Sequence, residues 1–107
     1  GVSVVAHIIE GADLETLRTA CDDLKARHDK CVVVLASIED GKIHLIAGVS
    51  KAFTKVVKAG DLVNFVATQV GGKGGGRPDM AQAGGTNIGA LPSALASVES
   101  WVGQKTS

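Results

Sequence analysis

A glycine-rich run between positions 71 and 85 limits the folds open to this chain more than any other feature. The run, GGKGGGRPDMAQAGG, holds seven of the fourteen glycines and the two cations Lys73 and Arg77. Glycine loses more conformational entropy on folding than any other residue, so such a run destabilises a fold unless something offsets it. Two requirements would explain why glycine is kept despite this cost: a backbone with φ > 0 at several positions, or a ligand that must approach closer than a β-carbon allows. Because cations flank the glycines, we expect a negatively charged ligand.

Hydrophobic periodicity predicts alternating strands and helices. Segments rich in β-branched or continuous apolar residues predict strands at 2–9, 31–38, 42–49 and 80–83. Apolar residues three and four positions apart predict helices at 14–28 and 62–70, and a third helix that begins near Leu91. Asp13 and Asp61 are suitable N-caps, and Gly71 is a suitable C′ residue. Asp40-Gly41 predicts a tight hairpin turn.

The resulting order β-α-β-β-α-β-α is typical of an α/β fold, a mixed sheet of about four strands with helices packed on it. A chain of 107 residues is long enough for one such domain, which we expect to span positions 1–107. The chain opens at Gly1 without an initiator methionine, which suggests a domain of a longer polypeptide. Neither a signal peptide nor an 18-residue apolar run is present, so we expect a cytoplasmic location and no membrane contact.

The chain has no net charge, but its charges are unevenly distributed. Residues 1–40 carry eight acids and four bases, whereas residues 42–77 carry six bases and Asp61 alone. Such asymmetry can give the protein one positively charged face that binds a polyanion, even though its isoelectric point is not basic. Lysines scattered over the whole surface would give the same charge counts. Only three aromatic residues are present, which weakens any case for base stacking.

The glycine run matches neither common nucleotide-binding loop. A Walker A loop needs Ser or Thr after its lysine, and Lys73 is followed by Gly74. No G-x-G-x-x-G follows a predicted strand and opens a helix. What remains is a loop whose backbone N–H groups bind an anion, with Lys73 as a point charge and Arg77 as a bidentate clamp. A linker or a strained turn is the structural alternative.

No catalytic or metal-binding constellation is recognisable in the sequence. His7, His28 and His44 lie apart from one another and from any carboxylate at ligand spacing. Cys21 and Cys31 lack metal-ligand spacing and are expected to be buried thiols. No serine or cysteine has the setting of a nucleophile, so we expect this chain not to be an enzyme.

The glycine run resembles the signature of the globular C-terminal domain of bacterial alanyl-tRNA synthetases, part of the wider DHH-associated family. The resemblance extends over nearly the whole chain, including the VVVLAS segment 32–37, AGDLV at 59–63 and the closing helix with Trp101. In phosphoesterase relatives a histidine typically follows the glycines, as in GGGH. Here Arg-Pro-Asp stands at 77–79, so the synthetase branch is the closer match.

The resemblance implies a non-catalytic tRNA-binding domain that grips the tRNA elbow and links aminoacylation with editing. The implied partners are tRNA, the other domains of the synthetase and a second copy in a homodimer. No cofactor is implied in this domain, since ATP, magnesium and zinc would act elsewhere in the parent enzyme. By motif position, the resemblance implies that the nucleic-acid-binding residues are Lys73, Gly74, Gly75, Gly76 and Arg77. We add Gln82, a polar side chain in the adjoining predicted strand, and the cation Lys51.

Two alternatives stay open at this point. The domain could be structural, with the glycine run packed against another domain or protomer of the same synthetase. It could also be a nucleic-acid-binding accessory domain of a DHH phosphoesterase.

Overall fold

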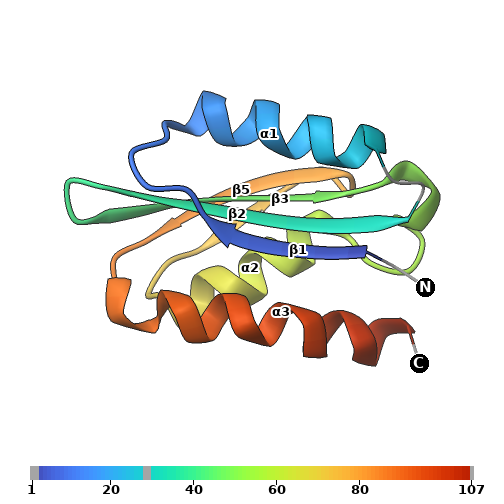
Figure 1. The fold of residues 1–107 in the computed structure, drawn as a ribbon. Coiled ribbons are helices and arrows are strands. Elements are labelled where there is room, and N and C mark those ends of the chain that lie inside the picture. The colour runs from blue at the N-terminus through green and yellow to red at the C-terminus, as the bar shows by residue number, and fades with distance from the viewer. Residues whose placement is uncertain (1–2, 28–29, 107) are drawn as a thin grey trace.

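The computed structural model describes residues 3–27 and 30–106, which form a five-stranded sheet covered by helices (Figure 1). The strands are β1 (Ser3–Ile8), β2 (Cys31–Glu39), β3 (Lys42–Val49), β4 (Gly74–Gly76) and β5 (Met80–Gly85). The α-helices are α1 (Leu14–Arg27), α2 (Ala59–Gln69) and α3 (Leu91–Thr106). Short 3-10 turns at Lys51–Phe53 and Ile88–Ala90 precede α2 and α3. No helix in the described ranges is long and apolar enough to cross a membrane.

The strand order in the sheet is β1-β2-β3-β5-β4. β1 pairs with β2 in parallel and the other neighbouring strands are antiparallel, so the sheet is mixed. β1 and β4 are the two edges. The interior strand β2 is buried from Cys31 to Ser37, which explains its nearly continuous apolar sequence.

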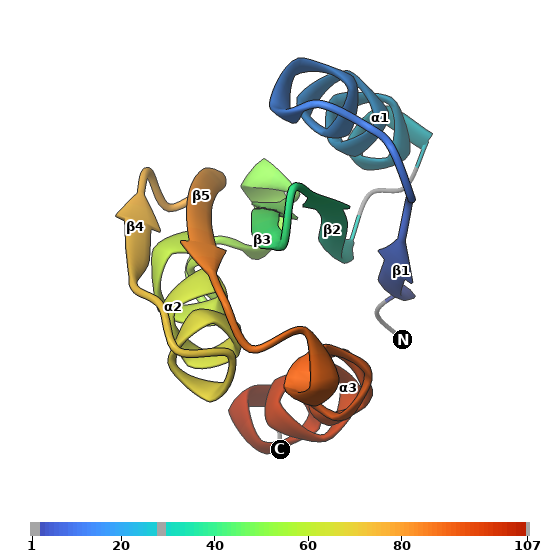
Figure 2. The same ribbon diagram turned by 90° about the vertical axis from the view of Figure 1, so that its left-hand side faces the viewer.

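Helices cover both faces of the sheet, and each covered face has its own core. Figure 2 shows α1 on one face and α2 with α3 on the other. Val32 and Val34 of β2 pack on the side of α2 and α3, whereas Val33 and Leu35 pack on the side of α1. Because successive side chains of a strand point to opposite faces of the sheet, the one apolar segment of β2 contributes to both cores.

Cys21 and Cys31 lie in the core beneath α1, as predicted, and both are free. Burial raises the pKa of the Cys21 thiol to about 12 and also raises the pKa of Cys31. Both thiols are therefore protonated at neutral pH and act as small apolar side chains.

The predicted α/β fold class is confirmed, and β4 is the element that the sequence did not predict. Three consecutive glycines carry no apolar alternation, so nothing in their pattern indicates a strand. β5 also runs to Gly85, two residues beyond the predicted end. The observed order is thus β-α-β-β-α-β-β-α. The predicted element ends at Val2 and His28 lie outside the described residues.

The predicted helix ends are confirmed at some positions and wrong at one. Asp13 caps α1, where its Oδ1 accepts a hydrogen bond from the Thr16 N–H at 2.8 Å. Gly71 has φ +78 and lies at C′ of α2, as expected for a glycine stop. Asp61, however, is in the first turn of α2 rather than at its N-cap, which is Lys58. The helix begins earlier because the Ala59 N–H is satisfied by the Pro78 carbonyl at 2.8 Å.

Candidate nucleic-acid interface

The glycine run forms the edge hairpin of the sheet. β4 and β5 are joined by a turn at Pro78-Asp79, where the Arg77 N–H donates to the Met80 carbonyl at 2.9 Å. α2 packs against this hairpin, and the turn is also bound to the strand β3 through the Val49 N–H, which donates to the Asp79 carbonyl at 3.0 Å. Arg77 therefore projects from a fixed turn rather than from a mobile linker.

Three glycines of the run are required by close packing around the hairpin. A β-carbon at Gly72 would collide with the Gly84 carbonyl, and one at Gly74 would collide with Ala83. A β-carbon at Gly76 would lie 2.9 Å from a backbone carbon of β5. These three positions explain much of the run without any ligand.

Gly75 is different. A β-carbon at this position would meet no atom of residues 3–27 or 30–106 within 4 Å, and the φ of Gly75 is not positive. Gly75 pairs with Gln82, and both line the side of the hairpin that faces α1. The packing of this chain does not require glycine here, so the missing side chain leaves open space above the sheet.

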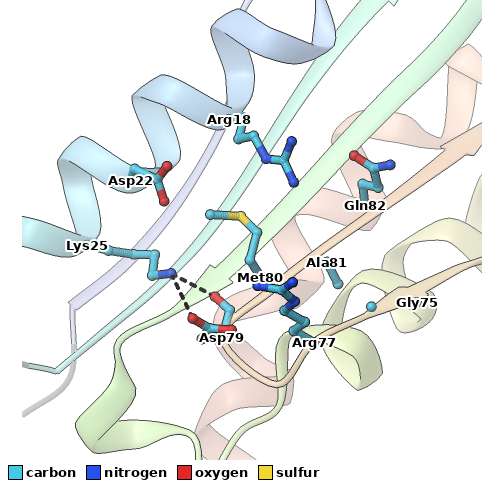
Figure 3. A pocket seen from close by; sticks show the side chains of 10 residues that line it. Arg18, Asp22, Lys25, Gly75, Arg77, Asp79, Met80, Ala81 and Gln82 are labelled. Carbon is cyan, nitrogen blue, oxygen red and sulfur yellow. Dashed lines mark hydrogen bonds and ion pairs between the residues drawn. The ribbon is translucent and has the colours of Figure 1, made fainter.

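A groove of about 430 Å³ lies between α1 and this face of the hairpin (Figure 3). α1 contributes Arg18, Asp22 and Lys25 to its wall. The hairpin contributes Gly75, Gly76, Arg77, Asp79 and Gln82, with Met80 and Ala81 on the floor. In Figure 3, Arg18 and Asp22 project from the helix towards the hairpin.

Helical periodicity places the three α1 residues on one face. Positions 18, 22 and 25 follow the i, i+4, i+7 spacing of a single stripe. α1 can approach the sheet closely because β3 has Gly48 beneath it. A β-carbon at Gly48 would collide with the Cys21 sulfur and lie 2.8 Å from Cδ of Lys25.

Lys25 ties the helix to the hairpin turn. Its Nζ donates to the Asp79 carbonyl at 2.9 Å and lies 3.9 Å from Asp79 Oδ2. The Lys25 side chain is only 14% exposed, so this contact is shielded from water. The charge-assisted bond fixes the distance between the two walls of the groove.

We expect Lys25→Met to lower the free energy of unfolding by about 1.5–3 kcal/mol, since it removes a shielded charged hydrogen bond and keeps most of the apolar stem. Arg27→Met is the matched control, because Arg27 forms an exposed 3.0 Å pair with Asp23 and should cost less than about 0.5 kcal/mol. Urea unfolding of both variants measures the difference. Equal losses in the two variants would contradict a structural role for Lys25.

Arg18 and Arg77 supply positive charge that the fold leaves available. In the described part of the chain, no hydrogen bond or ion pair to a side chain engages either guanidinium. Lys25, by contrast, is already bound to Asp79. An arginine presents a planar fork of donors that matches a phosphate, so the two walls of the groove can together bind an anion.

The structure brings together four of the predicted site residues: Gly75, Gly76, Arg77 and Gln82 line the groove. Gly74 faces the opposite side, where it packs on Ala83. Lys73 is exposed just before β4, at the end of the strand away from Arg77. Lys51 is exposed in the 3-10 turn after β3 and does not line the groove.

Sequence reasoning missed the α1 wall of the groove. Arg18 and Lys25 belong to residues 1–40, whose summed charge is negative, so a count along the chain hides them. Their spacing on α1 is the signal that could have found them. Within 3–27 and 30–106, no group of three His, Cys, Asp or Glu residues is placed to hold a metal ion.

The DHHA1 domain family matches residues 1–104. The chain belongs to this family. Within it, the chain is similar to the C-Ala domain of Aquifex aeolicus alanyl-tRNA synthetase, a solved structure with a TM-score of 0.84 and 34% identity. The match covers 90% of this chain and 87% of the Aquifex chain.

Curated relatives are named alanine–tRNA ligases. That of Janthinobacterium sp. (strain Marseille) is 57% identical over 105 residues, and that of Paraburkholderia phymatum is 62% identical over 102 residues. These matches cover 98% and 95% of this DHHA1 domain, but the domain spans only 12% of either relative. The resemblance to the DHH-associated domain of alanyl-tRNA synthetases is confirmed.

Proposed function

We propose that this DHHA1 domain is a tRNA-binding module of an alanine–tRNA ligase. One observation carries the proposal: Arg18 and Arg77 face a common groove beside Gly75, a glycine that internal packing does not require. Two guanidinium groups that no side chain of the described residues engages, beside backbone without a side chain, suit a ligand whose own backbone is anionic. The similarity to alanine–tRNA ligases supports tRNA as that ligand.

Within the tRNA, we propose that the elbow is the bound region and that the domain thereby helps to link aminoacylation with editing in the parent enzyme. Folded RNA presents shape, ribose and phosphate more than a readable base pattern. The groove matches such a surface, because its lining combines charged side chains and glycine with no aromatic ring. In this proposal ATP, magnesium and zinc act in other parts of a cytoplasmic synthetase.

Binding to tRNA at increasing salt tests the proposal. With about two to four cations in reach of phosphates, the logarithm of the association constant should fall with the logarithm of salt, by about 0.9 per phosphate contact. We expect measurable but weak binding at low salt, because tethering in the parent enzyme would raise the effective concentration of the domain. The absence of binding at low salt, or an affinity independent of salt, would contradict the proposal.

An assembly role is the second candidate, and the edge strand β1 favours it. β1 has the sequence SVVAHI, which contains no Asp, Glu, Lys, Arg or Pro. Its Ile8 is 37% exposed. Natural edge strands are normally protected against pairing by charge, proline or a bulge, so β1 is suited to a homodimer contact. Sedimentation without RNA tests this role: mass that rises with concentration supports it, and a constant monomer mass excludes it.

A further inference from the structure

Asp22 is out of place in a groove that is otherwise suited to a polyanion. It lines the groove from α1, one turn from both Arg18 and Lys25, and it is exposed. Its neighbours on the chain and in the groove have partners: Asp23 pairs with Arg27 at 3.0 Å, and Asp79 lies against Lys25.

No hydrogen bond or ion pair within the described ranges engages the Asp22 carboxylate, so its oxygens can accept a hydrogen bond from a ligand in the groove. A free carboxylate beside bound phosphates raises the energy of a complex by like-charge repulsion. The repulsion is offset if the ligand presents a hydrogen-bond donor to the carboxylate, because a hydrogen bond to a charged acceptor is roughly twice as strong as a neutral one.

We propose that the Asp22 carboxylate accepts a hydrogen bond from a ribose 2′-hydroxyl while Arg18 and Arg77 bind adjacent phosphate oxygens, so that the groove selects RNA over DNA. This assignment rests on the proposed tRNA binding and names the chemical group that the groove distinguishes. The 2′-hydroxyl is the group by which a protein tells RNA from DNA at a given site.

The position of Asp22 favours a ribose hydroxyl over a base edge. In a nucleic-acid strand the 2′-hydroxyl is only a few bonds from the neighbouring phosphate, whereas the base edges lie farther from the backbone. Asp22 shares its helix face with the phosphate-binding Arg18, so a donor that reaches the carboxylate lies beside the bound phosphate. DNA has no 2′-hydroxyl, so in a DNA complex the same carboxylate would lack a hydrogen-bond donor and would only repel the neighbouring phosphates.

Asp22→Ala tests the assignment, with Asp23→Ala as the matched control. Both changes remove one negative charge from exposed positions of α1, and alanine favours the helix. Of these two aspartates, Asp22 lines the groove and Asp23 does not. The dissociation constants are measured for a tRNA transcript and for a DNA strand of the same sequence, at one fixed salt concentration.

We expect Asp22→Ala to lower the ratio of tRNA affinity to DNA affinity by about fivefold or more, since the RNA complex loses a charged hydrogen bond and the DNA complex loses only repulsion. Asp23→Ala should leave the ratio unchanged within about twofold. A ratio that does not change in Asp22→Ala, or that falls equally in both variants, overturns the assignment while tRNA binding stands. If the unsubstituted domain binds no tRNA, the proposed function and this assignment fail together.

Discussion

Alanine at position 74 should severely destabilise the domain, whereas alanine at position 75 should leave its stability unchanged. The two glycines are neighbours in the same three-residue strand, β4. A β-carbon at Gly74 would collide with Ala83, which belongs to a paired strand and cannot retreat without moving the hairpin. A β-carbon at Gly75 would have no neighbour within 4 Å in the described part of the chain.

We expect Gly74→Ala to lower the free energy of unfolding by about 3 kcal/mol or more, at the upper end of overpacking effects. Gly75→Ala should stay within about 0.5 kcal/mol, or gain slightly because alanine restricts the unfolded chain. Urea unfolding monitored by circular dichroism measures both. Similar losses in the two variants would mean that the hairpin does not pack as described.

The second large effect is on RNA binding. Arg18→Ala and Arg77→Ala should each weaken tRNA binding by about tenfold, since each removes one charge-assisted contact worth about 1.5 kcal/mol or more. Each change should also reduce the salt slope by about one. Arg27→Ala is the control, because Arg27 is exposed on the same helix, pairs with Asp23 and does not line the groove.

The comparison of Arg18 with Lys51 and Lys73 locates the bound RNA. If binding occurs in the groove, Arg18→Ala should cost more affinity than Lys51→Ala or Lys73→Ala, whose side chains are exposed outside it. If both lysine variants lost about tenfold in tRNA affinity and Arg18→Ala lost none, the RNA would bind on another face of the domain and not in the groove.

Local sequence patterns predicted much of this fold because each pattern has a local physical cause. The alternating strands, the Asp13 cap and the Gly71 stop depend on residues close in the chain. The prediction of Asp61 as a cap is wrong because α2 begins where the distant Pro78 carbonyl satisfies the Ala59 N–H. Such a contact between remote segments leaves no trace in a local window.

The candidate site divides in the same way. The glycine run drew attention to the hairpin wall, including Arg77 and Gln82, which line the groove. The opposite wall depends on how α1 docks, and that docking is set by Gly48 and by the bond from Lys25 to Asp79. Gly48 lies 23 positions and Asp79 lies 54 positions from Lys25 in the sequence. Because of this separation, the sequence does not show that Arg18 and Arg77 line the same groove.

Chemical-shift mapping by NMR tests the central claim most directly, namely that tRNA binds between α1 and the β4–β5 hairpin. A ¹⁵N-labelled domain of 107 residues is titrated with tRNA at low salt. We predict that the largest shift changes fall on the amides of residues 18–25, 75–77 and 79–82. Changes concentrated in β1 and α3, with the groove residues unaffected, would contradict the claim.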